Sequence, residues 1–152
     1  MRGIMWGAAA LLFALPAVAG ELPIRPDPRL TPGAVLRTDT AIVCQPGYNR
    51  TVRHTSGKLK AAIYRKYRLD KSESHFEVDH LISLELGGSD VAANLWPESY
   101  DTILWNARVK DRLEDRLHAL VCAGRLPLEQ AQREIATDLI AAYKKYVGGP
   151  VP

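Results

Sequence analysis

An aspartate and a histidine stand side by side at positions 79 and 80, in the stretch F-E-V-D-H-L. The Asp79 carboxylate is a hard oxygen donor of the kind that divalent cations prefer. An imidazole changes its charge near neutral pH, so His80 is a candidate general base that takes a proton from water. Glu77 alternates with Asp79 along the stretch and competes with it as a ligand. Metal-assisted hydrolysis uses a hard oxygen ligand together with a base, so the pair is a candidate for that chemistry.

Polar residues further along recur at four-residue spacing: Asn106, Lys110 and Glu114. On a helix this spacing places them on one face. Asn106 is the candidate second metal ligand, from a helix that faces Asp79, and Glu114 is a further one. Lys110 and Arg108 are cations that would hold a phosphate group. The sequence therefore predicts a site between a strand and the helix that follows it.

Two short strands must position Asp79 and His80. The first is predicted from β-branched and apolar residues, namely Val78, Leu81, Ile82, Leu84 and Leu86. Gly87-Gly88 and Ser89-Asp90 end that strand, since glycine adopts backbone angles that other residues avoid. A second strand over 94–96 is ended by Pro97, which has no N–H group to donate.

Helices are predicted on both sides of this hairpin. The first is capped by Ser56 and runs to about Arg68, and the second runs from about Asp101 to Cys122. Its buried stripe consists of Leu113, Leu117, Leu120 and Val121. A last helix is predicted over 127–147 and a short strand within 34–44. The resulting fold class is α+β.

The stretch 76–115 resembles the HNH endonucleases, the ββα-metal finger nucleases. The resemblance rests on Asp79-His80 near the end of a strand, Gly87-Gly88 in the loop and Asn94 about fourteen positions on. The flanking letters E-V-D-H-L and N-L-W-P are similar to those of small exported bacterial members. The family's last ligand falls at 102–103, where this chain has Thr and Ile, so Asn106 takes that role.

The resemblance implies metal-dependent hydrolysis of nucleic-acid phosphodiesters with little sequence preference. His80 would be the base, and Asn94 would hold the loop and the base in place. Asp79, Asn106 and Glu114 would bind the metal, with Mg²⁺ expected first and Mn²⁺ or Zn²⁺ as alternatives. A cation neutralises the charge that builds on the phosphoryl oxygens. DNA is favoured over RNA as the partner, and a monomer is expected.

The chain of 152 residues is long enough for one domain with a core. Residues 1–19 have the positive end, apolar run and small-residue end of a secretory signal, too short for a membrane span. Residues 20–33 form a proline-rich arm, 34–148 the nuclease-like domain and 149–152 a tail. We therefore expect a secreted or periplasmic protein that leaves the membrane after cleavage.

The two cysteines, Cys44 and Cys122, are expected to form one disulfide in an exported chain. Closing so long a loop restricts the unfolded chain by roughly 4–5 kcal/mol on the entropic account. Two buried free thiols are the alternative. Zinc binding by this pair is disfavoured, because the sequence has no C-x-x-C or Cys-His cluster.

The net charge is only +3, so the protein is not basic throughout. Positive residues instead gather over 50–71, and within them Arg65 and Lys66 are candidate substrate-binding residues. Cations here would give a salt-sensitive affinity for phosphates that does not depend on sequence. The alternative is a solvated helix face with no binding role.

A different class of function stays open beside the nuclease. The irregular third ligand favours a non-catalytic exported binding or structural protein that retains the HNH-like scaffold. A secreted toxin-like effector is a third hypothesis, for which the sequence offers no delivery domain.

Overall fold

The computed structural model describes residues 25–70 and 75–149. The expected secretory signal over 1–19 and the last three residues of the expected tail lie outside them. Within the described residues no helix is long and apolar enough to cross a bilayer.

A two-stranded antiparallel hairpin stands at the centre of the fold, formed by β1 (Phe76–His80) and β2 (Leu95–Ser99). Asp79 lies opposite Trp96, and Glu77 lies opposite Glu98. Two bounds predicted from the sequence are wrong. The first strand ends at His80 instead of continuing to 86, where a single 3-10 turn, η1 (Leu84–Leu86), replaces it. The apolar residues there are buried in a loop under the helices. A short run of apolar residues looks the same in the sequence whether it forms a buried loop or a strand.

The second strand continues through Pro97, which was expected to end it. Each strand of a two-stranded sheet is an edge, so a residue without an N–H group is tolerated where that group would face outward. Pro97 lies opposite Val78 within the pairing.

Six α-helices surround the hairpin in the described part of the chain: α1 (Thr40–Val43), α2 (Tyr48–Val52), α3 (Gly57–Lys66), α4 (Ala107–Cys122), α5 (Leu128–Thr137) and α6 (Leu139–Tyr146). Ser56 caps α3 as predicted, with its hydroxyl oxygen accepting from the Leu59 backbone N–H. The strand predicted within 34–44 is wrong. Asp39 instead caps α1 there, and Val35 makes one isolated bridge to Gly88.

The bounds of the later helices also differ from the prediction. Helix α4 begins at Ala107 instead of near Asp101, because Asn106 caps it and residues 100–106 form a loop. The single helix predicted over 127–147 is two helices. Asp138 separates them with an extended backbone (φ −156°), and its side chain caps α6 through the N–H groups of Ile140 and Ala141.

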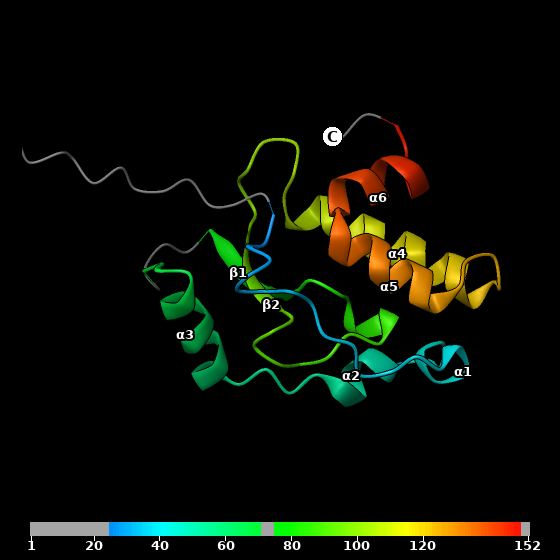
Figure 1. Cartoon of the computed structure of the whole chain (residues 1–152), viewed down its shortest axis with the longest axis horizontal. Helices are drawn as coiled ribbons and strands as arrows, with labels where there is room; N and C mark the ends of the chain where they lie inside the picture. The colour runs from blue at the N-terminus through cyan, green and yellow to red at the C-terminus, as the bar shows by residue number, and fades with distance from the viewer. Residues whose placement is uncertain (1–24, 71–74, 150–152) are drawn as a thin grey trace, which may run out of the picture.

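The hairpin lies between α3 on one side and the helices α4, α5 and α6 on the other (Figure 1). The larger core lies under those three helices and includes Leu113, Leu117 and Ile135, all fully buried. The smaller core joins α3 to the hairpin through Ile63, Val78 and Leu95. Each face of the hairpin is thus covered by different helices.

The described part of the proline-rich arm packs against the domain. Thr31 is buried, and its hydroxyl donates to the Leu95 carbonyl oxygen at 2.8 Å. The Gly33 N–H donates to the Ala93 carbonyl oxygen at 3.0 Å. Thr31 and Gly33 of the expected arm are therefore hydrogen-bonded to β2 and to the loop that precedes it.

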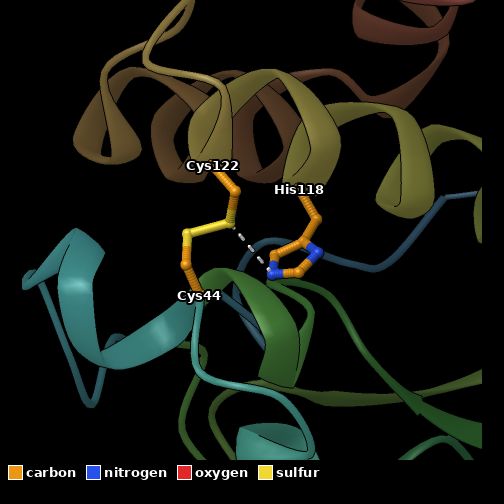
Figure 2. A group of neighbouring side chains, drawn as sticks. All are labelled: Cys44, His118 and Cys122. Carbon is orange, nitrogen blue, oxygen red and sulfur yellow. Dashed lines mark hydrogen bonds between the residues drawn. A yellow bond between two sulfur atoms is a disulfide. The ribbon is translucent and has the colours of Figure 1, made fainter.

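The predicted disulfide between Cys44 and Cys122 is confirmed, with the two Cα atoms 5.6 Å apart. It joins the residue that follows α1 to the last residue of α4 (Figure 2). The bond links the N-terminal helices to the helix that faces the hairpin. The α+β fold class, with a hairpin followed by helices, is confirmed with it.

Candidate active site

His80 is the last residue of β1, and its side chain is 2% exposed. The His80 Nε2 atom lies 2.7 Å from Oδ1 of Asp90. The other ring nitrogen, Nδ1, lies 3.9 Å from Oδ1 of Asp79. Side chains of neighbouring strand residues point to opposite faces. At the end of this strand the His80 ring and the Asp79 carboxylate nevertheless approach each other to just beyond hydrogen-bonding distance.

Asp90 fixes which nitrogen of His80 carries the proton. Burial raises the pKa of Asp90, but hydrogen bonds from the Thr55 hydroxyl, from His80 and from the His54 backbone N–H outweigh it and lower that pKa. An ionised carboxylate only accepts hydrogen bonds, so we assign the proton to Nε2 of His80. Nδ1 then keeps its lone pair in the neutral ring and faces Asp79.

His80 is held in its neutral form. Burial lowers its pKa most, and the hydrogen bond to Asp90 opposes part of that effect. The Arg53 guanidinium lies close enough to lower the pKa further. A neutral imidazole at neutral pH is the state that accepts a proton. The sequence did not single out Asp90 or Arg53, because Asp90 reaches His80 only when its loop folds back and Arg53 comes from the end of α2.

Asn94 holds the loop that leads from His80 to Asp90. It is fully buried, its Oδ1 atom accepts from the Ile82 N–H at 2.9 Å, and its Nδ2 atom donates to the carbonyl oxygens of Ile82 and Ser89. Oδ1 also accepts a longer bond from the Ala34 N–H, at 3.4 Å. The amide therefore binds both ends of the loop, and none of its bonds reaches His80.

The Gly87-Gly88 pair lies close against the backbone at Arg37 and at Ile82. A Cβ on Gly87 would lie 2.4 Å from the Arg37 carbonyl oxygen, and a Cβ on Gly88 would lie 1.8 Å from that of Ile82. Gly87 also has a φ of +77°, which side chains disfavour. Glycine is required here by close approach as much as by the turn.

The opposite face of the hairpin carries a buried ionic cluster. The Lys110 side chain, 1% exposed, contacts the carboxylates of Asp79 and Glu114 through its ammonium group. Oε2 of Glu98 lies 3.9 Å from the same nitrogen. We call Asp79, Glu98, Glu114 and Lys110 the acidic cluster. It sets three carboxyl groups against one ammonium group.

The pKa shifts in the acidic cluster follow from burial and from the charges that face one another. Burial disfavours charge on Lys110, but the three carboxyl groups outweigh it and raise its pKa, so it stays charged. Burial also acts on Asp79, but Lys110 overcomes it and lowers that pKa. For Glu114 burial prevails despite the contact with Lys110, and the pKa rises to about 8. Burial raises the pKa of Glu98 well above its usual range.

Glu98 was missed from the sequence. It follows N-L-W-P, where the second strand was expected to have ended. The strand continues, so Glu98 lies opposite Glu77 and on the same face as Asp79. Correct strand bounds would have found it. Glu77, the competing ligand, is half-buried and hydrogen-bonded to Tyr100.

Asn106, the expected second ligand beside Asp79, uses both ends of its side chain elsewhere. Oδ1 accepts from the Val109 N–H at 3.3 Å and so caps α4, while Nδ2 donates to the Thr102 carbonyl oxygen at 3.1 Å. Helix caps of this kind satisfy N–H groups that the helix leaves open. The structure therefore places Asn106 at the start of α4 as a capping residue, while Asp79 and Glu114 both hold Lys110.

The expected phosphate-binding residues divide into two kinds. Arg65 and Arg108 are exposed, and the Arg108 guanidinium stacks over the Tyr100 ring at 5.1 Å. Lys66 points inward, with its ammonium group donating to the carbonyl oxygens of Leu30 and Ala92. Lys110 is enclosed in the acidic cluster. The two lysines are thus engaged inside the protein, and the two arginines face solvent.

The acidic cluster offers the type of donor that a hard divalent cation prefers, but with Lys110 among them its three carboxyl groups do not bring oxygens within 4.8 Å of one another. Its carboxyl oxygens are the ligands that Mg²⁺ and Mn²⁺ prefer, and Oε2 of Glu98 is buried without a hydrogen-bond partner. The oxygens nevertheless surround the Lys110 ammonium group. Among the described residues, the potential ligands that converge within 4.8 Å are Cys44, His118 and Cys122. Both of those sulfurs are in the disulfide, with His118 beside them (Figure 2).

No family model, curated protein sequence or solved structure matches this chain.

Proposed function

We infer that the protein is an exported endonuclease of the HNH type, which hydrolyses nucleic-acid phosphodiester bonds with low sequence specificity. One observation supports this most. His80 is neutral and buried, Asp90 holds its Nε2–H, and Nδ1 is turned toward Asp79. A histidine oriented by a carboxylate is the arrangement that general bases need.

Each residue around His80 has a separate role in the proposed hydrolysis. Nδ1 of His80 accepts the proton of the attacking water, while Asp90 stabilises the imidazolium that forms. Asn94 keeps the loop, and with it Asp90, in place. Exposed Arg108 and Arg53 are the cations that meet the phosphate group, because Lys110 is enclosed. Arg53 is the one whose charge already acts on His80.

A divalent cation, Mg²⁺ before Mn²⁺ or Zn²⁺, would be held by Asp79, Glu98 and Glu114. Its chemistry is to neutralise charge that develops on the phosphoryl and leaving oxygens. Glu98 takes the place that the sequence gave to Asn106, since the Asn106 amide caps α4. Carboxyl oxygens are hard donors, which favours Mg²⁺ over Zn²⁺.

Binding of nucleic acid would be mainly electrostatic. Arg65 on α3 is exposed, next to the hairpin that carries His80. Contacts with phosphates carry no sequence information, which is why low specificity is proposed. DNA is the first substrate to test, and the disulfide is in keeping with the oxidising compartment of an exported monomer.

Two observations favour the alternative, a non-catalytic exported binding or structural protein. His80 is only 2% exposed, and the Lys110 ammonium group occupies the centre of the acidic cluster. A buried histidine and an enclosed lysine are both arrangements that a protein without any reaction can have. In that case the hairpin would serve only to hold α3 and α4.

The test is cleavage by the purified protein of supercoiled plasmid and of a structured RNA, with Mg²⁺, Mn²⁺, Zn²⁺ or EDTA. We expect nicking that EDTA abolishes and that His80→Gln reduces strongly. Intact plasmid and RNA under every condition, from a protein whose circular dichroism shows it folded, would favour the non-catalytic alternative.

A further inference from the structure

Glu98 is the unusual member of the acidic cluster. Its side chain is nearly fully buried, and its Oε2 atom has no hydrogen-bond partner. That atom is directed at Lys110 but stops 3.9 Å from the ammonium nitrogen, while Asp79 and Glu114 contact the same nitrogen directly. A buried carboxyl oxygen without a partner is costly. One ammonium group therefore does not satisfy the oxygens that surround it.

We propose that Lys110 and a divalent cation compete for Asp79, Glu98 and Glu114, so that a cation binds only when the Lys110 ammonium group leaves the cluster. This competition rests on the proposed function, in which the cation at Asp79, Glu98 and Glu114 takes part in hydrolysis. Lys110 would then regulate cation binding at that site. The competition also removes Lys110 from the phosphate-binding residues.

The competition follows from distance and charge. Carboxylate oxygens hold Mg²⁺ at about 2.0–2.1 Å and Ca²⁺ at about 2.3–2.6 Å. A cation bound to oxygens that already contact the ammonium nitrogen would lie against that nitrogen. Two positive charges at such a distance, shielded from water, repel each other strongly. The cluster accommodates one of them at a time.

Lysine is suited to this exchange. Its ammonium group is a compact charge on a flexible stem of four carbons, so it can move without a change in the backbone. Lys110 lies in the first turn of α4, with Asn106 capping that turn by bonds independent of the cluster. Simple departure of the ammonium group would leave buried carboxylates unpaired, whereas exchange for a cation would not.

The first experiment uses the wild-type protein and measures lysine reactivity. An N-hydroxysuccinimide ester acetylates exposed amines, and mass spectrometry reads each site. Without a cation we expect Lys110 to be protected and exposed Lys144 to react. Saturating Mn²⁺ should raise acetylation of Lys110 at least severalfold. Lys66 is the internal control, because it is also engaged inward but with carbonyl oxygens, and its reactivity should not change.

The second experiment removes the competitor. If the ammonium group occupies the cluster more than about nine-tenths of the time, its removal raises apparent cation affinity at least about tenfold. Calorimetry should therefore show Mn²⁺ binding Lys110→Met at least about tenfold more tightly than wild type. Lys66→Met, the matched control, should bind like wild type. Adding Glu98→Gln to Lys110→Met should reverse much of the gain.

Lys110→Met is expected to be less stable without a cation, since it leaves the carboxyl groups unpaired. Circular dichroism with and without Mn²⁺ covers that case: recovery of the helical signal on adding Mn²⁺ supports the proposal. Failure to recover, equal affinity of variant and wild type, or Lys110 that stays protected at saturating Mn²⁺ overturns it.

The outcomes separate this proposal from the nuclease itself. Cleavage that EDTA abolishes, together with a Lys110 that never becomes reactive, overturns the competition and leaves the nuclease standing. Release of Lys110 by Mn²⁺ in a protein that cleaves neither DNA nor RNA has the opposite meaning. It supports the competition and removes the nuclease.

Discussion

The two faces of β1 differ in how well their polar groups are satisfied. On the face toward α3, His80 is bonded to Asp90, and the Asn94 amide uses both of its ends in the loop beside them. On the face toward α4, one ammonium group is shared among three carboxyl groups, and one Glu98 oxygen has no partner. Both faces are buried, so exposure to water does not explain the difference.

When every buried polar group in a network has a hydrogen-bond partner, the side chains are held in one arrangement. When one group has no partner, exchanging partners can lower the free energy. The His80 face is therefore suited to hold a base at a fixed place. The Lys110 face is suited to exchange one cation for another. A protein that only needed stability would have little reason to bury three carboxyl groups around one lysine, because such clusters contribute little net stability.

The largest effect is expected from His80→Gln, which removes the proposed base from the satisfied face. Turnover should fall about 10²–10⁴-fold, the usual contribution of a positioned base. Plasmid nicking measures it, with a thermal melt to verify the fold. His75→Gln is the matched control, because His75 is exposed and pairs with Asp101 away from the site. Equal loss in both variants would remove His80 from catalysis.

Asn94→Ala should have the largest effect on stability. The change leaves the Ile82 N–H and the carbonyl oxygens of Ile82 and Ser89 without their partner in a buried loop. Each unsatisfied buried group costs about 1–3 kcal/mol, so the loss from three such groups is expected to be at least about 3 kcal/mol. Urea unfolding measures it, with m unchanged. A loss below about 1 kcal/mol would mean that water replaces the amide.

Much of this arrangement could be predicted from local signals. Asp79-His80, the Gly-Gly turn and Ser56 before an apolar helix each act within a few residues, and the structure contains the expected hairpin and cap. The disulfide followed from two cysteines in a chain that begins like an exported one. The turn and cap signals depend on neighbouring residues, which the sequence displays directly, and the disulfide needed no such signal because the chain has only two cysteines.

The sequence could not show which of two possible roles a side chain has. Asn106 has the right spacing for a ligand and the right type for a cap, and only the position at which α4 begins decides. Glu98 needed the strand register, and Asp90 needed the loop to fold back on His80. Lys66 and Arg65 are adjacent, yet one points inward and the other outward.

Asp90→Asn tests the His80 face of β1 and is expected to have a smaller effect on stability than Asn94→Ala. The pKa of Asp90 is lowered in the folded protein from its usual 3.8, so its stabilisation is present above that value and is lost as the pH falls through the lower folded pKa. The variant should be about 1–2 kcal/mol less stable than wild type at pH 7. Urea unfolding should show this difference shrinking in acid. A difference independent of pH would mean that the charge of Asp90 is unimportant.

Asn106→Ala separates the two uses of that residue. Loss of a helix cap costs about 1 kcal/mol, and Asn106→Ser should restore most of it because serine also caps. Mn²⁺ affinity, measured by calorimetry, should be the same for both variants and for wild type. Weaker Mn²⁺ binding in both variants would return Asn106 to the metal ligands and leave Glu98 without that role.

The smallest effect concerns the exposed surface beyond either face. If Arg65 contacts a backbone phosphate, Arg65→Glu should raise the KM for plasmid and reduce the salt dependence by about one unit of the log–log slope. Turnover at saturating substrate should change little, since such contacts stabilise the ground and transition states alike. Lys66→Met is the matched comparison on the same helix: its ammonium group binds the carbonyl oxygens of Leu30 and Ala92, so it should lower stability and leave the slope unchanged. Cleavage rates across a series of salt concentrations decide, because a helix that is only a solvated face predicts the same slope for Arg65→Glu as for wild type.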